Sequence, residues 1–131
     1  MQITRQADYA VRAMVYLAQK GPEKPIATST IAKEKSIPPS FLAKIVSQLS
    51  VAGLLLTARG ARGGVSLAKP AETISLLDVV EAIDGPILLN DCVGENKICD
   101  YDNDCPLKPV WCDAQKMLLE QLSKANFAQF A

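Results

Sequence analysis

The sequence predicts a mainly α fold, in which a winged helix-turn-helix domain is followed by a long C-terminal helix. Apolar residues recur at helical spacing through most of the first 84 residues, two strand-like segments flank a glycine-rich turn, and an amphipathic stripe ends the chain. A chain of 131 residues that is 49% hydrophobic and 21% charged fits one ordinary domain or a small domain with an appendage. It also has enough apolar material for a packed core.

The first helix is expected over residues 5–20. Gly21 and Pro22 follow it directly, and both residue types end helices. Its buried face is expected to consist of Ala7, Ala10, Val11, Met14, Leu17 and Ala18, which recur at three- and four-residue steps.

Two further helices are expected to form a helix-turn-helix unit. The first has about seven residues, with Thr28 as its N-cap and with Ile31 and Ala32 buried. A Ser-Ile-Pro segment breaks it, and Pro39 suits the first turn of the next helix, which runs to Ala52. The apolar stripe of that helix consists of Leu42, Ile45, Val46 and Leu49. In this motif the second helix can enter the major groove of DNA.

A β-hairpin is expected directly after this unit. Its strands are residues 54–57 and 65–67, and its tip is the segment Arg59-Gly60-Ala61-Arg62-Gly63-Gly64. Glycine allows a close approach of the backbone to a partner, and arginine suits a narrow, negative minor groove. Taken alone, the hairpin is equally compatible with an ordinary surface turn.

The second half of the chain is expected to contain a fourth helix, a loop and a long terminal helix. Ser75 caps the fourth helix, which ends at Asp84. Residues 90–106 are polar and lack a helical or strand period, which predicts a loop. From about Leu107 to Phe127 an apolar stripe returns. A chain this small can hardly bury that stripe, so an equivalent helix of a partner subunit is expected to cover it.

Three parts follow from this reading. Residues 1–85 form the DNA-binding domain, residues 86–106 form a cysteine-bearing loop, and residues 107–131 form a dimerisation helix with a tail. Charge is also sorted along the chain, because residues 1–70 carry ten basic and three acidic groups while the other 61 carry four basic and eleven acidic groups. The basic half could meet a polyanion or simply pair with the acidic half, and charge alone does not separate these alternatives.

The candidate DNA contacts lie on the third helix, the hairpin and the second helix. We expect Ser40 and Lys44 to touch the major groove, and the exposed face of the same helix also offers Ser47 and Gln48. The minor-groove contacts are expected from Arg59 and Arg62, and the phosphate contacts from Thr28 and Lys33.

Composition argues against an enzyme and against a membrane protein. The chain has no histidine, which excludes Ser-His-Asp and Cys-His catalytic arrangements and imidazole metal ligands. No apolar run approaches the length of a membrane span, and the N-terminus lacks the apolar stretch of a signal peptide. We expect a cytoplasmic protein that is not an enzyme.

All four cysteines lie in one window, at Cys92, Cys99, Cys105 and Cys112. Crowded thiols in a cytosolic chain favour metal binding or redox chemistry over structural disulfides. Structural zinc sites usually contain a closer pair than these spacings of six, five and six residues provide. An iron-sulfur cluster accepts more varied spacing and ranks first, a disulfide switch ranks second and zinc third.

Together these segments resemble a family of bacterial winged-helix regulators that includes IscR, NsrR and CymR. The resemblance runs nearly end to end, through residues 4–17, Ile31-Ala32, residues 41–45, 49–54, the two glycine-bearing ends of the hairpin tip and residues 74–85. It implies a DNA-binding transcriptional regulator that forms a homodimer, with crossing C-terminal helices and one palindromic half-site for each subunit.

The resemblance also implies an iron-sulfur cluster, of two or four irons, ligated by Cys92, Cys99 and Cys105. Lys108 stands where some members have a histidine ligand. Asp8 matches the aspartate that NsrR-like members supply from the partner subunit, and Cys112 is a rival for the fourth position.

The expected function is therefore that of a regulator that senses redox state, nitric oxide or iron-sulfur status through the cluster. Two alternatives remain open. One is a regulator of the same fold without a cluster, switched by thiol oxidation or zinc. The other is a small enzyme or electron carrier, which would leave the basic half without a role.

Overall fold

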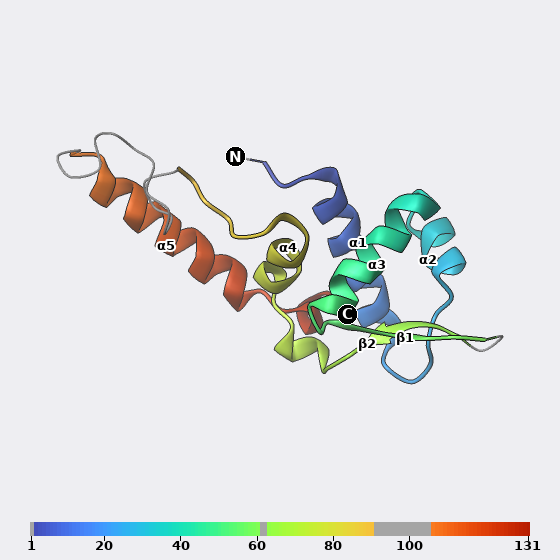
Figure 1. Ribbon diagram of the computed structural model, residues 1–131. Helices are drawn as coiled ribbons and strands as arrows, with labels where there is room; N and C mark the ends of the chain where they lie inside the picture. Colours follow the sequence, from blue (N-terminus) through green and yellow to red (C-terminus); the bar gives the residue numbers. More distant parts are fainter. Residues whose placement is uncertain (1, 61–62, 91–105) are drawn as a thin grey trace.

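The computed structural model describes residues 2–60, 63–90 and 106–131 (Figure 1). The helices are α1 (Arg5–Lys20), α2 (Thr28–Glu34), α3 (Pro39–Val51), α4 (Leu76–Asp84) and α5 (Lys108–Lys124), with two short 3-10 turns, η1 (Ala71–Thr73) and η3 (Phe127–Phe130). Strands β1 (Leu55–Ala58) and β2 (Gly64–Leu67) form an antiparallel hairpin in which Leu55 pairs with Leu67 and Ala58 with Gly64. This confirms the predicted mainly α fold with a helix-turn-helix unit and a wing.

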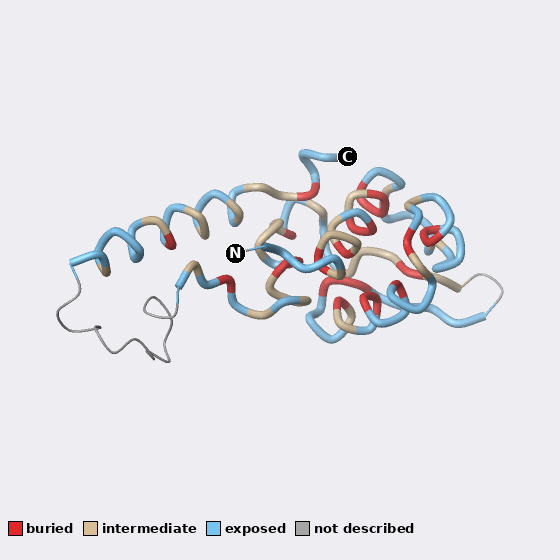
Figure 2. Tube along the Cα trace, turned by 90° about the horizontal axis from the view of Figure 1, so that it is seen from above, coloured by how far each residue is buried: buried red, intermediate tan, exposed pale blue. Residues whose placement is uncertain are grey.

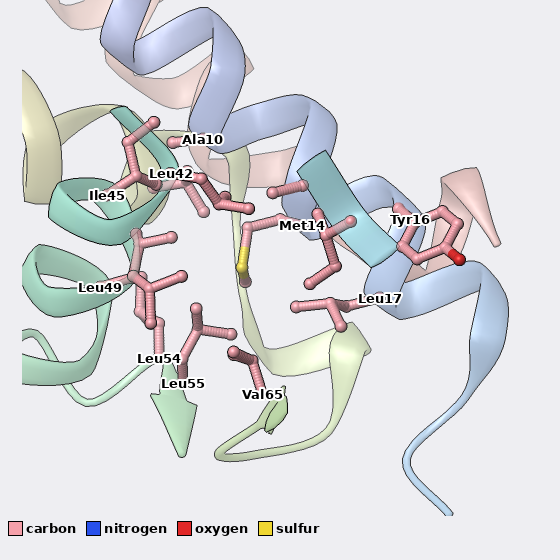
Figure 3. Packing of buried hydrophobic residues seen from close by; sticks show 14 of the residues in the cluster. Ala10, Met14, Tyr16, Leu17, Leu42, Ile45, Leu49, Leu54, Leu55 and Val65 are labelled. Carbon is pink, nitrogen blue, oxygen red and sulfur yellow. The ribbon is translucent and has the colours of Figure 1, made fainter. Parts of the chain in front are cut away.

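Helix α1 runs through the centre of the body, by which we mean residues 2–84 and 125–131 as far as they are described. It packs against α3, α4 and η3. Figure 3 shows Met14 of α1 among side chains of α3 and of both wing strands. The predicted face of α1 is confirmed except that Val11 is half-buried, and Ala13 and Tyr16 join it. These contacts give the helix-turn-helix unit and the wing one shared core.

Local capping explains where α1 and α4 begin. The side chain of Thr4 accepts a hydrogen bond from the backbone N–H of Ala7 (3.1 Å). Ser75 is the N-cap of α4, as predicted, and it forms a capping box with Asp78. Thr4 also donates from its backbone N–H and its hydroxyl to the carboxylate of Asp84, which ties the start of α1 to the end of α4.

Two predicted boundaries of the helix-turn-helix unit are corrected. Thr28 is the first residue of α2 and makes no capping hydrogen bond, because Ala27 occupies the N-cap position. Helix α3 ends at Val51, with Ala52 as its C-cap. Gly53 (φ 80°) then follows in the left-handed conformation, and the backbone N–H of Leu54 donates to the carbonyl of Leu49 (2.9 Å).

The predicted end of the terminal helix was wrong. Helix α5 stops at Lys124, and the next residues pair with the segment before α4 instead of continuing the helix. The N–H of Leu76 donates to the carbonyl of Ala125 (2.8 Å), and that of Phe127 donates to Ile74 (3.1 Å). The ring of Phe127 is thereby fully buried in the core of the body.

The arm, which is helix α5, projects from the body (Figure 1) and is mostly exposed (Figure 2). Among its seventeen residues, all of which are described, Gln115 is the one buried side chain. Its amide donates to the carbonyl of Ile87 and accepts from the N–H of Leu89 (2.9 Å), so it holds the segment after α4 against the arm. No helix in the described part of the chain is long and apolar enough to cross a membrane.

Candidate nucleic-acid interface

The turn between α2 and α3 is closed by backbone hydrogen bonds. Ser36 adopts a left-handed conformation (φ 52°), and the N–H of Ile37 donates to the carbonyl of Ala32 (2.9 Å). This is the hydrogen bond of a Schellman motif, and the side chain of Ile37 is buried. The turn therefore fixes the angle at which α3 leaves α2.

Helix α3 presents its predicted contact residues unequally. Ser40, Lys44 and Ser47 are exposed, whereas Gln48 is half-buried. The buried Oε1 atom of Gln48 accepts no hydrogen bond from the described residues, so part of its amide is turned away from solvent. Ser40, Lys44 and Ser47 are consequently more accessible to solvent than Gln48 is.

The wing is held beside the entry to α2. The N–H of Ile26 donates to the carbonyl of Val65 (2.9 Å), and the N–H of Val65 donates to that of Ile26 (2.8 Å). Gly64 (φ 150°) makes this approach possible, because a Cβ atom there would lie 2.4 Å from the carbonyl oxygen of Ile26. Arg59 is exposed just after β1, while Arg62 lies outside the described residues.

Aromatic contacts brace the N-terminal end of α3 against α1. The rings of Tyr9 and Phe41 lie 6.0 Å apart, and the guanidinium of Arg12 lies 5.6 Å from the centre of the Tyr9 ring. Sequence patterns did not indicate this contact or the pairing of Ile26 with Val65. Adjacent Gly63 and Gly64 were the available sign of a close backbone approach.

The two predicted phosphate contacts lie on helix α2. Both Thr28 and Lys33 are exposed. Lys44 of α3 and Arg59 after β1 are exposed as well, and such cationic and hydroxyl side chains are the types that bind DNA phosphates.

The predicted metal ligands fall into two groups. Cys92, Cys99 and Cys105 lie outside the described residues. Asp8 is in the first turn of α1, 46% exposed, and its Oδ2 atom lies 2.8 Å from a guanidinium nitrogen of Arg12. The thiol of Cys112 is exposed on the arm. Within residues 2–60, 63–90 and 106–131, no three cysteine, aspartate or glutamate side chains are grouped as metal ligands.

Both described candidates are chemically able to act as the fourth ligand of a cluster. An exposed ion pair such as Asp8–Arg12 contributes at most about 1 kcal/mol, so little opposes its exchange for another partner. The thiol of Cys112 is open to solvent and would offer a soft sulfur ligand. Both side chains are accessible to solvent, so both Asp8 and Cys112 remain candidates for the fourth ligand.

The chain is similar in sequence to known regulators. The family model Rrf2, described as an iron-dependent transcriptional regulator, matches residues 3–131. A relative from Mycobacterium tuberculosis (strain CDC 1551 / Oshkosh), named as an HTH-type transcriptional regulator, is 33% identical over 131 residues. The match covers 100% of this chain and 81% of the relative.

Solved structures of regulators have the same fold. CymR, the global cysteine regulator of B. subtilis, superimposes with a TM-score of 0.84 at 25% identity, covering 100% of this chain and 98% of CymR. IscR of T. potens gives a TM-score of 0.77 at 26% identity, covering 98% and 84%. The oxidized form of Staphylococcus aureus CymR gives 0.76 at 26% identity, covering 98% and 94%.

These findings confirm the predicted family and fold, and they confirm that the chain is a regulator and not an enzyme. The wing and α3 belong to a DNA-binding regulator of the winged-helix kind. The chain belongs to the Rrf2 family of transcriptional regulators.

Proposed function

We propose that the protein binds palindromic DNA as a homodimer and reports redox state, nitric oxide or iron-sulfur status through an iron-sulfur cluster. The observation that supports the DNA-binding part is the wing, which is hydrogen-bonded to the entry of α2 beside an exposed α3. In this arrangement Ser40, Lys44 and Ser47 read the major groove. Arg59 and Arg62 enter the minor groove, and Thr28 and Lys33 contact phosphates.

The arm supports the dimeric part of the proposal. It carries large apolar side chains that the chain itself leaves exposed, namely Val110 (62%), Trp111 (37%) and Met117 (70%). Apolar surface of this kind on a helix marks a contact with another chain. A second arm packed on it would bury these side chains and place two copies of α3 on successive turns of one face of DNA.

The cluster would be held by Cys92, Cys99 and Cys105, with Asp8 of the partner subunit or Cys112 as the fourth ligand. The arm begins at its outer end, away from α1 (Figure 1), so a second subunit is a natural source of Asp8. When bound, the cluster supplies a centre that oxidants, nitric oxide or iron shortage can alter. Asp8 would then exchange its ion pair with Arg12 for a bond to iron.

The test is to purify the protein without oxygen and to measure its absorption, iron and acid-labile sulfide. We expect broad visible absorption, iron and sulfide in a fixed ratio, and a difference in operator affinity between cluster-loaded and cluster-free protein. Asp8→Asn and Cys112→Ser variants then identify the fourth ligand by the change in the spectrum. Equal operator affinity of the two forms would rule out the cluster as the switch.

A second candidate is a cluster-free regulator switched by thiol oxidation or by zinc. The similarity to S. aureus CymR, one structure of which is described as an oxidized form, and the exposed thiol of Cys112 favour it. A colourless, iron-free protein that cannot be reconstituted, but changes operator affinity on mild oxidation or on zinc removal, would support this candidate.

A further inference from the structure

A groove of about 620 Å³ lies between α2 and α3. Its floor consists of the buried apolar side chains Ala32, Ile37, Leu42 and Val46. Its rim includes Thr28 and Lys33 of α2 and Pro39 and Ala43 of α3, all of which are exposed. The helix-turn-helix unit thus leaves an apolar hollow open between its two helices.

This groove is continuous with the DNA-facing surface of α3. Ala43 lies three residues after Ser40 and four before Ser47, and residues at these spacings share one face of a helix. Both serines are exposed, as Ala43 is. A base edge that approaches Ser40 or Ser47 therefore also comes within reach of the Ala43 methyl group and of the groove behind it.

The hydrogen-bonding capacity of the exposed side chains determines which base edge this surface can recognise. The side chains of Ala43 and Pro39 can neither donate nor accept a hydrogen bond, so they cannot recognise the nitrogen and oxygen atoms of base edges. In the major groove the four bases present a single apolar group, the 5-methyl group of thymine, and alanine and the threonine methyl are its usual contacts. The groove offers the first of these contacts, from Ala43.

We infer that Ala43 and the groove between α2 and α3 select thymine in the operator by receiving its 5-methyl group. Ala43 is then a specificity-determining residue, while Ser40, Lys44 and Lys33 supply hydrogen bonds and phosphate contacts. The inference rests on the proposed binding of DNA through α3.

Deoxyuridine provides the test, because it retains every hydrogen-bonding group of thymidine and lacks the methyl group. An operator is first selected from random duplexes, and each thymidine of one half-site is then replaced singly. Burial of one methyl group corresponds to about 0.8 kcal/mol, so we expect roughly fourfold weaker binding at one or two positions. Replacements elsewhere in the half-site are expected to leave the affinity unchanged.

Ala43→Gln assigns the effect to the groove. Glutamine is a good helix former at this exposed position, and it fills the rim with a polar group. We expect the thymidine-to-deoxyuridine ratio of affinities to fall to about one in this variant. Ala128→Gln, an exposed alanine in η3, is the matched control and is expected to keep the fourfold ratio.

Two results would overturn the inference while leaving DNA binding intact. One is an operator whose affinity is insensitive to deoxyuridine at every position. The other is an Ala43→Gln protein that binds all operators more weakly but keeps the fourfold ratio. Failure to select any DNA would instead refute the proposed function, and the inference with it.

Discussion

The body and the arm bury their apolar side chains in different ways. In the body, side chains from α1, α2, α3, α4, both wing strands and η3 share one cluster. In the arm, Val110, Trp111 and Met117 stay exposed, and the buried residue is the polar Gln115. An amphipathic pattern therefore predicts a helix in both regions, but it does not say whether the apolar face is covered by the same chain.

This difference has an energetic consequence. The core contacts of the body lie within one chain, so they form without a partner. A helix that owes its packing to a second chain is stabilised by mass action, and its order depends on concentration. Substitutions in the two regions should therefore be separable by dilution.

The largest effect is expected at Phe127, which lies next to the arm in sequence and belongs to the body in space. Phe127→Ala should lower the free energy of unfolding by about 3–5 kcal/mol, because it leaves a cavity at a fully buried site. Urea unfolding at several protein concentrations measures it. Phe130→Ala is the control, since that neighbouring ring is 38% exposed. Similar losses in the two variants would contradict the assignment of Phe127 to the core.

The second effect concerns the arm. In the proposed dimer, Trp111→Ala should weaken self-association by about 2 kcal/mol or more, because large aromatic side chains contribute strongly to binding at interfaces. Sedimentation equilibrium measures the dimer constant, and the unfolding of dilute protein should change little. Glu120→Gln, a change at an exposed polar position of the same helix, serves as the control. Unaltered self-association in Trp111→Ala would place the contact between subunits elsewhere.

A smaller and more local effect is expected at Gln115. Replacing it by Leu leaves the carbonyl of Ile87 and the N–H of Leu89 without their side-chain partner, at a cost of about 1–3 kcal/mol. Hydrogen exchange of the Leu89 amide should become faster, while the amides of α1 keep their protection. Gln121→Leu, at an exposed position of the arm, should alter neither. Unchanged exchange at Leu89 in the Gln115 variant would contradict the two hydrogen bonds.

The smallest effect is expected at the start of α4. Ser75→Ala removes the hydroxyl that accepts a hydrogen bond from the backbone N–H of Asp78, and it should cost about 1 kcal/mol, measured as a shift in the urea midpoint. Ser123→Ala, near the end of the arm, removes a hydroxyl that bonds its own helix and is the comparison. A larger loss in Ser123→Ala than in Ser75→Ala would reverse the expected order of the two regions.

Sequence patterns predicted most elements because Gly and Pro mark their ends. Gly21, Pro39, Gly53 and Gly85 each stand at or next to an observed helix boundary. The end of α5 lacked such a marker, since Ala125 and Asn126 are compatible with a helix, and the pairing of Asn126 with Ser75 is a long-range contact. Local periodicity contains no information about partners fifty residues away.

The candidate interface was predictable to a similar degree. Exposed Ser40, Lys44 and Ser47 follow from the helical face opposite the apolar stripe. The inward turn of the Gln48 amide depends on packing between elements, as do the Tyr9–Phe41 contact and the bridge from Ile26 to the wing. Such contacts join residues that are distant in sequence, so a pattern along one segment does not contain them.

The pairing of residues 125–127 with 74–76 also brings the chain back to the start of α4 after the arm. Residues 85–124 leave the C-terminal end of α4 and return at its N-terminal end, nine helical residues or about 13 Å away. A linker of about five residues spans that distance. Residues 87–124, which contain the arm, are thus an insertion into the body. A chain with such a linker in their place should retain Phe127 in its core and, because the proposed dimer forms through the arm, should be a monomer.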